Sequence, residues 1–259
     1  MNDDSRYMAP LQLAGRLIME NGGETYRVEE TITRMGRAFG LKEVESFAVP
    51  SGVFISYRGE DGDIHTAVKR VRRGATNLTR VNDVNAVSRR VEAERLSCEE
   101  TLRSLEEIAG CKPWISPRLQ RIAAAASSGA WVVLFGGMGW DLACGLVVGW
   151  LVQVLAQMLN RFHMQTLVAT LLGSFVAALL PMAFHRLTGL GMMDVIVAGT
   201  LMPMLPGLAM TNAVQDTMRG DMVSGLSHGA SAVLTAVLVA GGALMATSLF
   251  SLLTGGAAL

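Results

Sequence analysis

The stretch LACGLVVGWLVQVLAQML, residues 142–159, decides the fold because it contains no charged side chain. Only Gln153 and Gln157 interrupt its apolar surface after Leu146. A core helix of a soluble bundle would carry polar residues every three to four positions. A helix needs about 20 apolar residues to cross the roughly 30 Å of hydrocarbon in a bilayer. We therefore predict that this stretch crosses a membrane.

Four further apolar stretches flank it. Residues 122–138 and 164–184 are also free of charge. Residues 193–208 carry Asp194 at the start and Pro203, Pro206 and Gly207 near the end, which indicates a broken or partly embedded helix. Residues 222–253 contain only His228 as a titratable group and exceed the length of one crossing. The pattern predicts about five transmembrane helices.

Charge divides the chain into two parts. Hydrophobic residues make up 51% of the 259 positions and charged residues 17%, and 19 of the 22 Lys and Arg residues and 18 of the 22 Asp and Glu residues lie at or before Arg121. Neither part has the basic excess of a nucleic-acid-binding protein, so we exclude that class. We predict an α/β cytosolic domain over residues 1–115, followed by an all-α polytopic membrane domain over residues 116–259.

The N-terminal part shows alternating helix and strand signals. Pro10 can begin a helix that residues 21–23, Asn-Gly-Gly, terminate, and a second amphipathic helix runs from about Glu24 to Gly40. Residues 53–57 and 64–68 alternate around an Asp-Gly pair at 61–62, which predicts a hairpin, and residues 44–49 add a third strand. Two more helices are predicted over residues 83–96 and after Ser97, where Ser97 and Glu100 fit a capping box.

Basic residues near the spans predict the orientation. Arg118 and Arg121 precede the first apolar stretch, and Lys and Arg are retained on the cytoplasmic side of a membrane. The N-terminal domain is therefore predicted to be cytoplasmic. No cleavable signal peptide is expected, because the first 20 residues have mixed charge and no uninterrupted apolar core. The three cysteines share no C-x-x-C spacing, so we predict no metal site and no cofactor.

The segment PGLAMTNAVQDTMRGD, residues 206–221, concentrates polar groups between two apolar stretches. If it is helical, Asn212, Asp216 and Arg219 lie on one stripe and can line a substrate path. Pro206 and Gly207 interrupt the preceding helix, and interrupted helices expose backbone groups that hold ionic substrates in many transporters. The candidate path residues are Pro206, Gly207, Thr211, Asn212, Asp216, Arg219 and Asp221. In the alternative, the segment is an interfacial loop in which Asp216 and Arg219 neutralise each other or face cytoplasmic water, and Asp221 is an ordinary N-terminal residue of the last helix.

Three further residues are weaker candidates for the same path. Asp141 follows a glycine-rich turn, where it can instead begin a helix. Asp194 follows Gly189 and Gly191 and can likewise cap a helix. His228 lies one to two turns inside the final apolar stretch, where it could act as a proton relay.

A dense polar cluster marks the second predicted helix. Its candidate residues are Glu24, Tyr26, Arg27 and Glu29. Paired carboxylates beside a tyrosine could perform acid–base catalysis. A solvated helix face with ion pairs between neighbouring turns explains the same residues, and we favour that interpretation, so no catalytic residue is assigned.

Several motifs together resemble the threonine/serine exporter (ThrE) family. They are NGGETYRVEETITRMGRAFGL at residues 21–41, VPSGVFISY at 49–57, FGGMGWD at 135–141, PGLAMTNAVQD at 206–216 and RGDMVSGLSHGASAV at 219–233. The resemblance covers almost the whole chain and implies export of a small carboxylate, either threonine and serine or a dicarboxylate such as succinate, across a bacterial inner membrane. Fused members carry a second membrane region, so the chain looks like the larger subunit of the split form. That form implies a small multi-span partner and an oligomeric assembly.

Two hypotheses follow. In the first, the chain is a transporter subunit whose membrane part lines a path in contact with lipid. In the second, it is a membrane-anchored cytosolic enzyme or sensor, in which the helix at residues 24–37 carries the chemistry. One or two spans are enough for anchoring, so the predicted spans and their polar residues favour the exporter.

Overall fold

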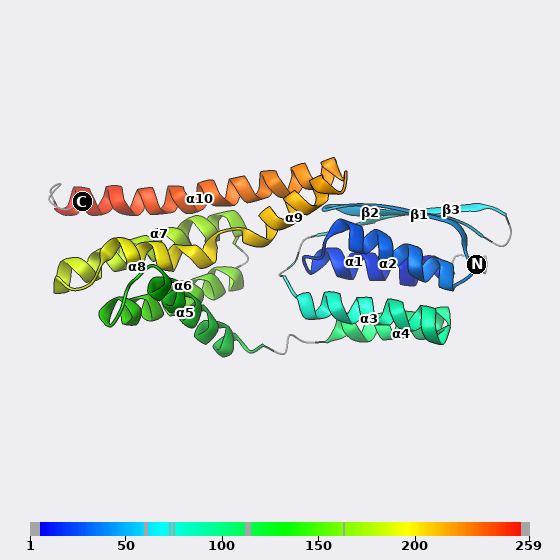
Figure 1. Cartoon of the computed structure of the whole chain (residues 1–259), viewed down its shortest axis with the longest axis horizontal. Coiled ribbons are helices and arrows are strands. Elements are labelled where there is room, and N and C mark those ends of the chain that lie inside the picture. The colour runs from blue at the N-terminus through cyan, green and yellow to red at the C-terminus, as the bar shows by residue number, and fades with distance from the viewer. Residues whose placement is uncertain are drawn as a thin grey trace. The chain divides into compact units, whose positions relative to one another are not determined.

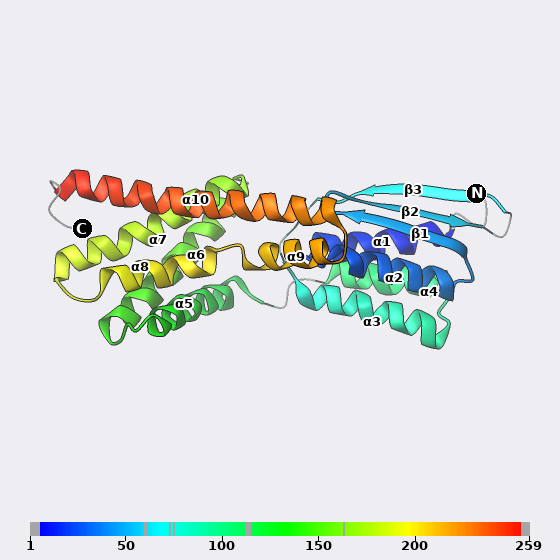
Figure 2. The ribbon, with the colours of Figure 1, turned by 45° about the horizontal axis from the view of Figure 1, so that its top comes forward.

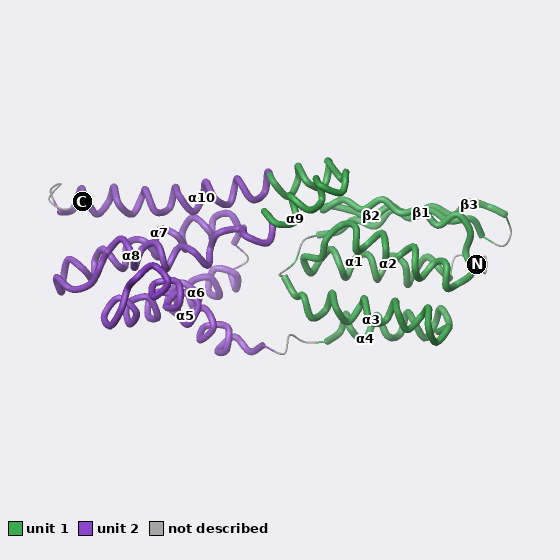
Figure 3. Tube along the Cα trace, in the orientation of Figure 1, with its two compact units in different colours: residues 1–112, 210–229 green, residues 113–209, 230–259 purple. Residues whose placement is uncertain are grey.

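The computed structural model describes residues 6–59, 62–72, 74, 76–111, 115–162 and 164–254. The chain folds into two compact units (Figure 3). The first comprises residues 1–112 together with 210–229, and the second comprises residues 113–209 together with 230–259. Each unit is described by itself.

The first unit is built in three layers (Figures 1 and 2). A sheet of strands β1 (Lys42–Val49), β2 (Gly52–Arg58) and β3 (Ile64–Arg70) forms the outer layer. Helices α1 (Met8–Glu20) and α2 (Thr25–Ala38) cover one face of this sheet. Helices α3 (Leu78–Glu94) and α4 (Cys98–Gly110) pack on the other side of α1 and α2.

The sheet follows the predicted hairpin. β2 pairs antiparallel with both β1 and β3, so the order is β1-β2-β3. Along β2, Val53, Ile55 and Tyr57 point into the core, whereas Phe54 between them is exposed. This alternation is the period of two expected for a sheet buried on one face. Asp61 of the predicted turn lies outside the described residues.

Local capping explains where the last two helices of this unit begin. The Ser97 side chain accepts from the Glu100 backbone N–H, and the Glu100 carboxylate accepts from the Ser97 N–H, which confirms the capping box. α3 begins five residues earlier than predicted, because the Asn77 side chain accepts from the Arg80 N–H and caps the helix there.

Two helices of the C-terminal half contribute to the first unit. Helix α9 (Gly207–Met218) and the first turns of α10 (Met222–Thr254) supply residues 210–229. Gly225 allows the close approach between them, since a Cβ added there would lie 3.0 Å from the Ala213 carbonyl oxygen and in collision with the Thr217 hydroxyl. The α10 helix, with 33 residues, is about 50 Å long and exceeds the roughly 30 Å hydrocarbon thickness.

The second unit is a group of packed apolar helices. These are α5 (Pro117–Leu134), α6 (Trp140–Arg161), α7 (Thr166–Thr188) and α8 (Met193–Leu201), the 3-10 helix η2 (Met202–Met204), and the remainder of α10. Small residues bring α5 and α6 together, because a Cβ at Gly149 would lie 2.9 Å from the Ala124 carbonyl oxygen. Close contact through small residues is typical of helices that pack inside a membrane.

Three helices, rather than the predicted five, are by themselves long and apolar enough to cross a membrane. They are α6, α7 and α10, within the part of the chain that the structure describes. The predicted span over residues 122–138 is wrong, because α5 ends at Leu134 and its first turns carry Arg118 and Arg121. The predicted broken helix at 193–208 corresponds to α8 and η2, which together with the bent continuation α9 could form a fourth span.

The predicted fold class is therefore wrong in two respects. The chain is mainly helical with one small three-stranded sheet, and no separate N-terminal α/β domain is present, because residues 210–229 complete the unit that residues 1–112 begin. The physical reason is the polar face of α9 and of the first turns of α10. That face is buried against α2 and β1, so the sequence order of the helices does not give the unit boundaries.

Candidate functional site

The segment formed by α9 and the start of α10 buries four polar side chains and exposes most of its large apolar ones. Asn212, Asp216, Ser224 and His228 are buried. Large apolar side chains on the same segment are exposed, and these are Met210, Val214, Met218, Met222, Val223 and Leu226. A helix on a water-soluble surface has the opposite arrangement. The segment is thus organised around its polar interior.

Asp216 is the centre of this interior and is 0% exposed. Its Oδ1 accepts a hydrogen bond from the Thr25 hydroxyl at 2.9 Å, and its Oδ2 lies 2.9 Å from Nδ1 of His228. An ionised carboxylate can only accept, so His228 carries a proton on Nδ1 in that state. Thr25 is the first residue of α2, where the helix dipole favours negative charge. Both oxygens of the buried carboxylate are therefore satisfied.

Asn212 lies one turn before Asp216 and is only 1% exposed. Its Nδ2 group has no hydrogen-bond partner within the described part of the chain. A buried amide without a partner is costly, and such groups are typical of sites that bind a water molecule or a ligand. We refer to Thr25, Asn212, Asp216 and His228 as the Asp216 cluster.

The end of β1 connects the cluster to α2. The Ala48 N–H donates to Oε1 of Glu29 at 2.9 Å, and the Ala48 carbonyl accepts from the Ser224 hydroxyl at 3.2 Å. Burial raises the pKa of the Glu29 carboxyl group, the hydrogen bond from Ala48 lowers it, and the charges of Asp221 and Asp216 raise it further. Glu29 therefore shares a region of negative charge with two aspartates.

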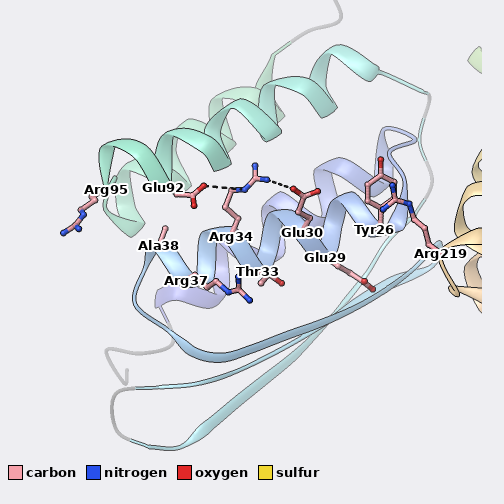
Figure 4. A pocket seen from close by; sticks show the side chains of 10 residues that line it. All are labelled: Tyr26, Glu29, Glu30, Thr33, Arg34, Arg37, Ala38, Glu92, Arg95 and Arg219. Atoms are coloured by element: carbon pink, nitrogen blue, oxygen red, sulfur yellow. Dashed lines mark hydrogen bonds and ion pairs between the residues drawn. The ribbon is translucent and has the colours of Figure 1, made fainter.

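A charged cleft of about 840 Å³ runs along α2 (Figure 4). We call it the α2 cleft, and its lining residues are Tyr26, Glu29, Glu30, Thr33, Arg34, Arg37, Ala38, Glu92, Arg95 and Arg219. Arg34 lies between Glu30 and Glu92 and pairs with both carboxylates. All ten residues belong to the first unit.

Arg219 connects α9 to this cleft. Its guanidinium group lies 3.5 Å from the centre of the Tyr26 ring, which is a cation–π contact. Arg27 pairs with Glu24 and lies 5.5 Å from the same ring centre. The structure thus brings Tyr26 of the predicted N-terminal cluster together with Arg219 of the predicted substrate path.

The other residues of the predicted path have more peripheral positions. Pro206 and Gly207 form the break between η2 and α9, and Thr211 is exposed on α9. Asp221 lies in the turn between α9 and α10, where its N–H donates to the Asp216 carbonyl at 2.9 Å. Asp216 pairs with His228 and Arg219 contacts Tyr26, so Asp216 and Arg219 form no ion pair with each other.

Asp141 and Asp194 lie in the second unit. Oδ1 of Asp141 accepts from the Met192 N–H at 2.7 Å, which fixes the connection between α7 and α8 to the start of α6. Asp194 is exposed in the first turn of α8. Met192 occupies the capping position of that helix, so Asp194 is not its cap.

Sequence reasoning missed Thr25 and Ser224. A hydroxyl near the start of a helix usually indicates a cap, so the sequence around Thr25 does not predict its hydrogen bond to Asp216, 191 positions later. Ser224 lies one turn before His228, and this spacing of four residues could have indicated a shared buried face. No group of three or more His, Cys, Asp or Glu side chains in the described ranges could hold a metal ion.

Comparisons with known proteins show which family the chain resembles. A family model described as "Putative threonine/serine exporter" (ThrE) matches residues 11–250. The chain is 27% identical over 240 residues to the "Probable succinate transporter subunit YjjP" of Klebsiella aerogenes, covering 91% of this chain and 90% of that protein. It is 25% identical to the protein of the same name in Escherichia coli, covering 92% of each chain.

A longer relative matches over part of its length. The chain is 24% identical over 246 residues to the "Probable threonine/serine exporter" of Mycobacterium tuberculosis, covering 92% of this chain and 46% of that protein. No solved structure matches the chain. The family match covers most of the sequence, and the apolar helices α6, α7 and α10 are long enough to span a bilayer. The chain is a membrane protein that belongs to the threonine/serine exporter (ThrE) family.

Proposed function

We propose that the chain is a subunit of an inner-membrane exporter of small carboxylates, either the amino acids threonine and serine or a dicarboxylate such as succinate. The names of its relatives support both classes. The Asp216 cluster is the observation that carries the proposal. A buried carboxylate and an unpartnered amide on α9, together with an imidazole in the first turns of α10, a helix long enough to cross the membrane, are groups that can transfer protons or bind polar substrates.

A second membrane subunit completes the exporter in this proposal. The Mycobacterium relative is about twice as long as the region that this chain matches, and two other relatives are named as subunits. In this proposal a small multi-span partner corresponds to the part of the Mycobacterium relative that this chain does not match. The apolar side chains exposed on α9 and α10 would contact that partner, a second copy of the chain, or lipid.

The first unit lies on the cytoplasmic side in this proposal. Arg118 and Arg121 precede α6, the first helix that meets the length and hydropathy requirements of a span, and basic residues of this kind are retained in the cytoplasm. With this orientation, the α2 cleft is open to substrates made inside the cell, and the buried Asp216 cluster belongs to the same unit.

Co-expression with a candidate small membrane subunit tests the proposal. Cells loaded with threonine, serine or succinate are transferred to substrate-free medium, and release of each compound is measured over time. We expect release to be accelerated for at least one compound only when both chains are present. Equal release with and without the chain, while the chain is detected in the membrane fraction, would overturn the proposal.

A further inference from the structure

The α2 cleft contains charges that its internal ion pairs do not neutralise. Arg34 forms ion pairs with Glu30 and Glu92. Among the described residues, the other charged groups of the cleft, which are Glu29, Arg37, Arg95 and Arg219, form no ion pair with one another. A cleft that keeps both signs of charge unpaired is suited to a ligand that also carries both.

Glu29 is held in position by the protein backbone. The Ala48 N–H donates to its Oε1 at 2.9 Å, which leaves Oε2 without a partner in the described part of the chain. Asp216 and Asp221 are close enough to Glu29 to disfavour its ionised form. A cationic group bound beside Glu29 would relieve this repulsion.

Arg219 is held in position by an aromatic ring. Its guanidinium group stacks over Tyr26 at 3.5 Å, and this stacking leaves the N–H groups at the edge of the plane available to donate. A planar guanidinium group with free N–H groups can bind a carboxylate through two parallel hydrogen bonds. Tyr26 and Glu29 are three residues apart on α2, so the ring that Arg219 contacts and the Glu29 carboxylate occupy neighbouring positions along the helix, and both line the cleft (Figure 4).

We propose that the α2 cleft binds an α-amino acid as its zwitterion, with the carboxylate on Arg219 and the ammonium group on Glu29. Glu29 is then the residue that selects amino acids against dicarboxylates. The second carboxylate of a dicarboxylate would lie beside Glu29 in the region already occupied by the charges of Asp216 and Asp221. Like charges at that distance reduce affinity, whereas the ammonium group of an amino acid is attracted.

Equilibrium binding to the full-length protein tests this assignment. The inference rests on the proposed function for the role of the ligand as transported substrate, but binding can be measured without transport. Detergent-purified protein is titrated calorimetrically with L-threonine and, separately, with succinate at neutral pH. We expect threonine to bind at least tenfold more tightly than succinate.

Two variants and two matched controls locate the site. Glu29→Gln and Arg219→Gln are each expected to weaken threonine binding at least tenfold, and Glu29→Gln is expected to reduce the preference over succinate. Glu94→Gln and Arg90→Gln remove the same charges from an exposed ion pair on α3, outside the cleft, and are expected to change affinity less than twofold. Thermal unfolding of every variant verifies that it is folded.

The results separate this inference from the proposed function. Succinate binding as tight as threonine binding, or unchanged threonine affinity in folded Glu29→Gln protein, would overturn the assignment of the cleft. Neither result bears on whether the chain takes part in export. Conversely, selective threonine binding that depends on Glu29, in a protein that releases no substrate from cells, would support the site and contradict the exporter.

Discussion

The carboxylate of Asp216 and the imidazole of His228 lie 2.9 Å apart, although twelve residues and a helix break separate them. The pair is buried, with side-chain exposures of 0% and 5%. Gly225 permits the close approach of α9 and α10 that brings the two residues together. A buried pair of this kind restricts the relative position of the two helices, because each group needs the other as a hydrogen-bond partner.

The two members of this pair are expected to be energetically coupled. Asp216→Ala and His228→Ala should each destabilise the protein by about 3 kcal/mol, because each leaves the other group buried without its partner. The double variant should lower the free energy of unfolding by clearly less than the sum of the two single effects. Unfolding of detergent-purified protein measures the three values, and additivity within about 0.5 kcal/mol would contradict the coupling.

Thr25 is expected to contribute through its hydroxyl group. Thr25→Val has nearly the same shape but leaves Oδ1 of Asp216 without a donor, and it should lower the free energy of unfolding by about 1–3 kcal/mol. Thr25→Ser retains the hydroxyl and serves as the control. A valine variant as stable as the serine variant would show that this hydrogen bond contributes nothing.

Glu29 is expected to make stability depend on pH. Its folded-state pKa is raised, mainly by burial, so its stabilising contribution is complete below the unfolded-state pKa and is lost as the pH rises through the raised value. Glu29→Gln removes this loss. The melting temperature of the variant minus that of the wild type should therefore increase between about pH 4 and pH 7, the range that begins near the ordinary glutamate pKa. A constant or decreasing difference would show that the carboxyl group has no raised pKa.

The contact between α9 and α10 depends on Gly225 and not on Gly229, the other glycine near it. Gly225→Ala should destabilise the protein, because its Cβ would lie 3.0 Å from the backbone carbonyl of Ala213 and collide with Thr217. Gly229→Ala places its Cβ at an ordinary 3.8 Å from Ala213 and is the matched control. The yield of monodisperse protein after solubilisation and its melting temperature measure the effect. Equal behaviour of the two alanine variants would contradict this packing.

Much of the local structure could be predicted from the sequence, because the signals are local. The helix break at Asn21-Gly22-Gly23, the capping box of Ser97 and the alternation along β2 depend on neighbouring residues only. The apolar stretches of α6, α7 and α10 were recognisable for the same reason, since a window of about 20 residues contains the whole signal.

The composition of the units could not be predicted, because it depends on contacts between distant segments. The spacing of Asn212 and Asp216 predicts a polar stripe on α9, but neither the depth of this stripe nor its partner can be inferred from local sequence. Its partner Thr25 lies 191 residues earlier, and the Ser224 hydroxyl binds a β1 carbonyl 176 residues away. The number of spans was overestimated for a related reason. Arg118 and Arg121 belong to α5, although the apolar stretch was predicted to begin after them.

Substrate release from preloaded cells by Asp216→Asn protein tests whether the Asp216 cluster is required for export. We expect release to fall to less than a tenth of the wild-type rate while the protein remains folded in the membrane, and we expect Glu24→Gln, which removes the partly exposed ion pair with Arg27, to leave release unchanged. Normal release by Asp216→Asn together with loss of release by Glu24→Gln would contradict the account. That result would favour the alternative in which the chain is a membrane-anchored enzyme or sensor whose chemistry is carried by α2.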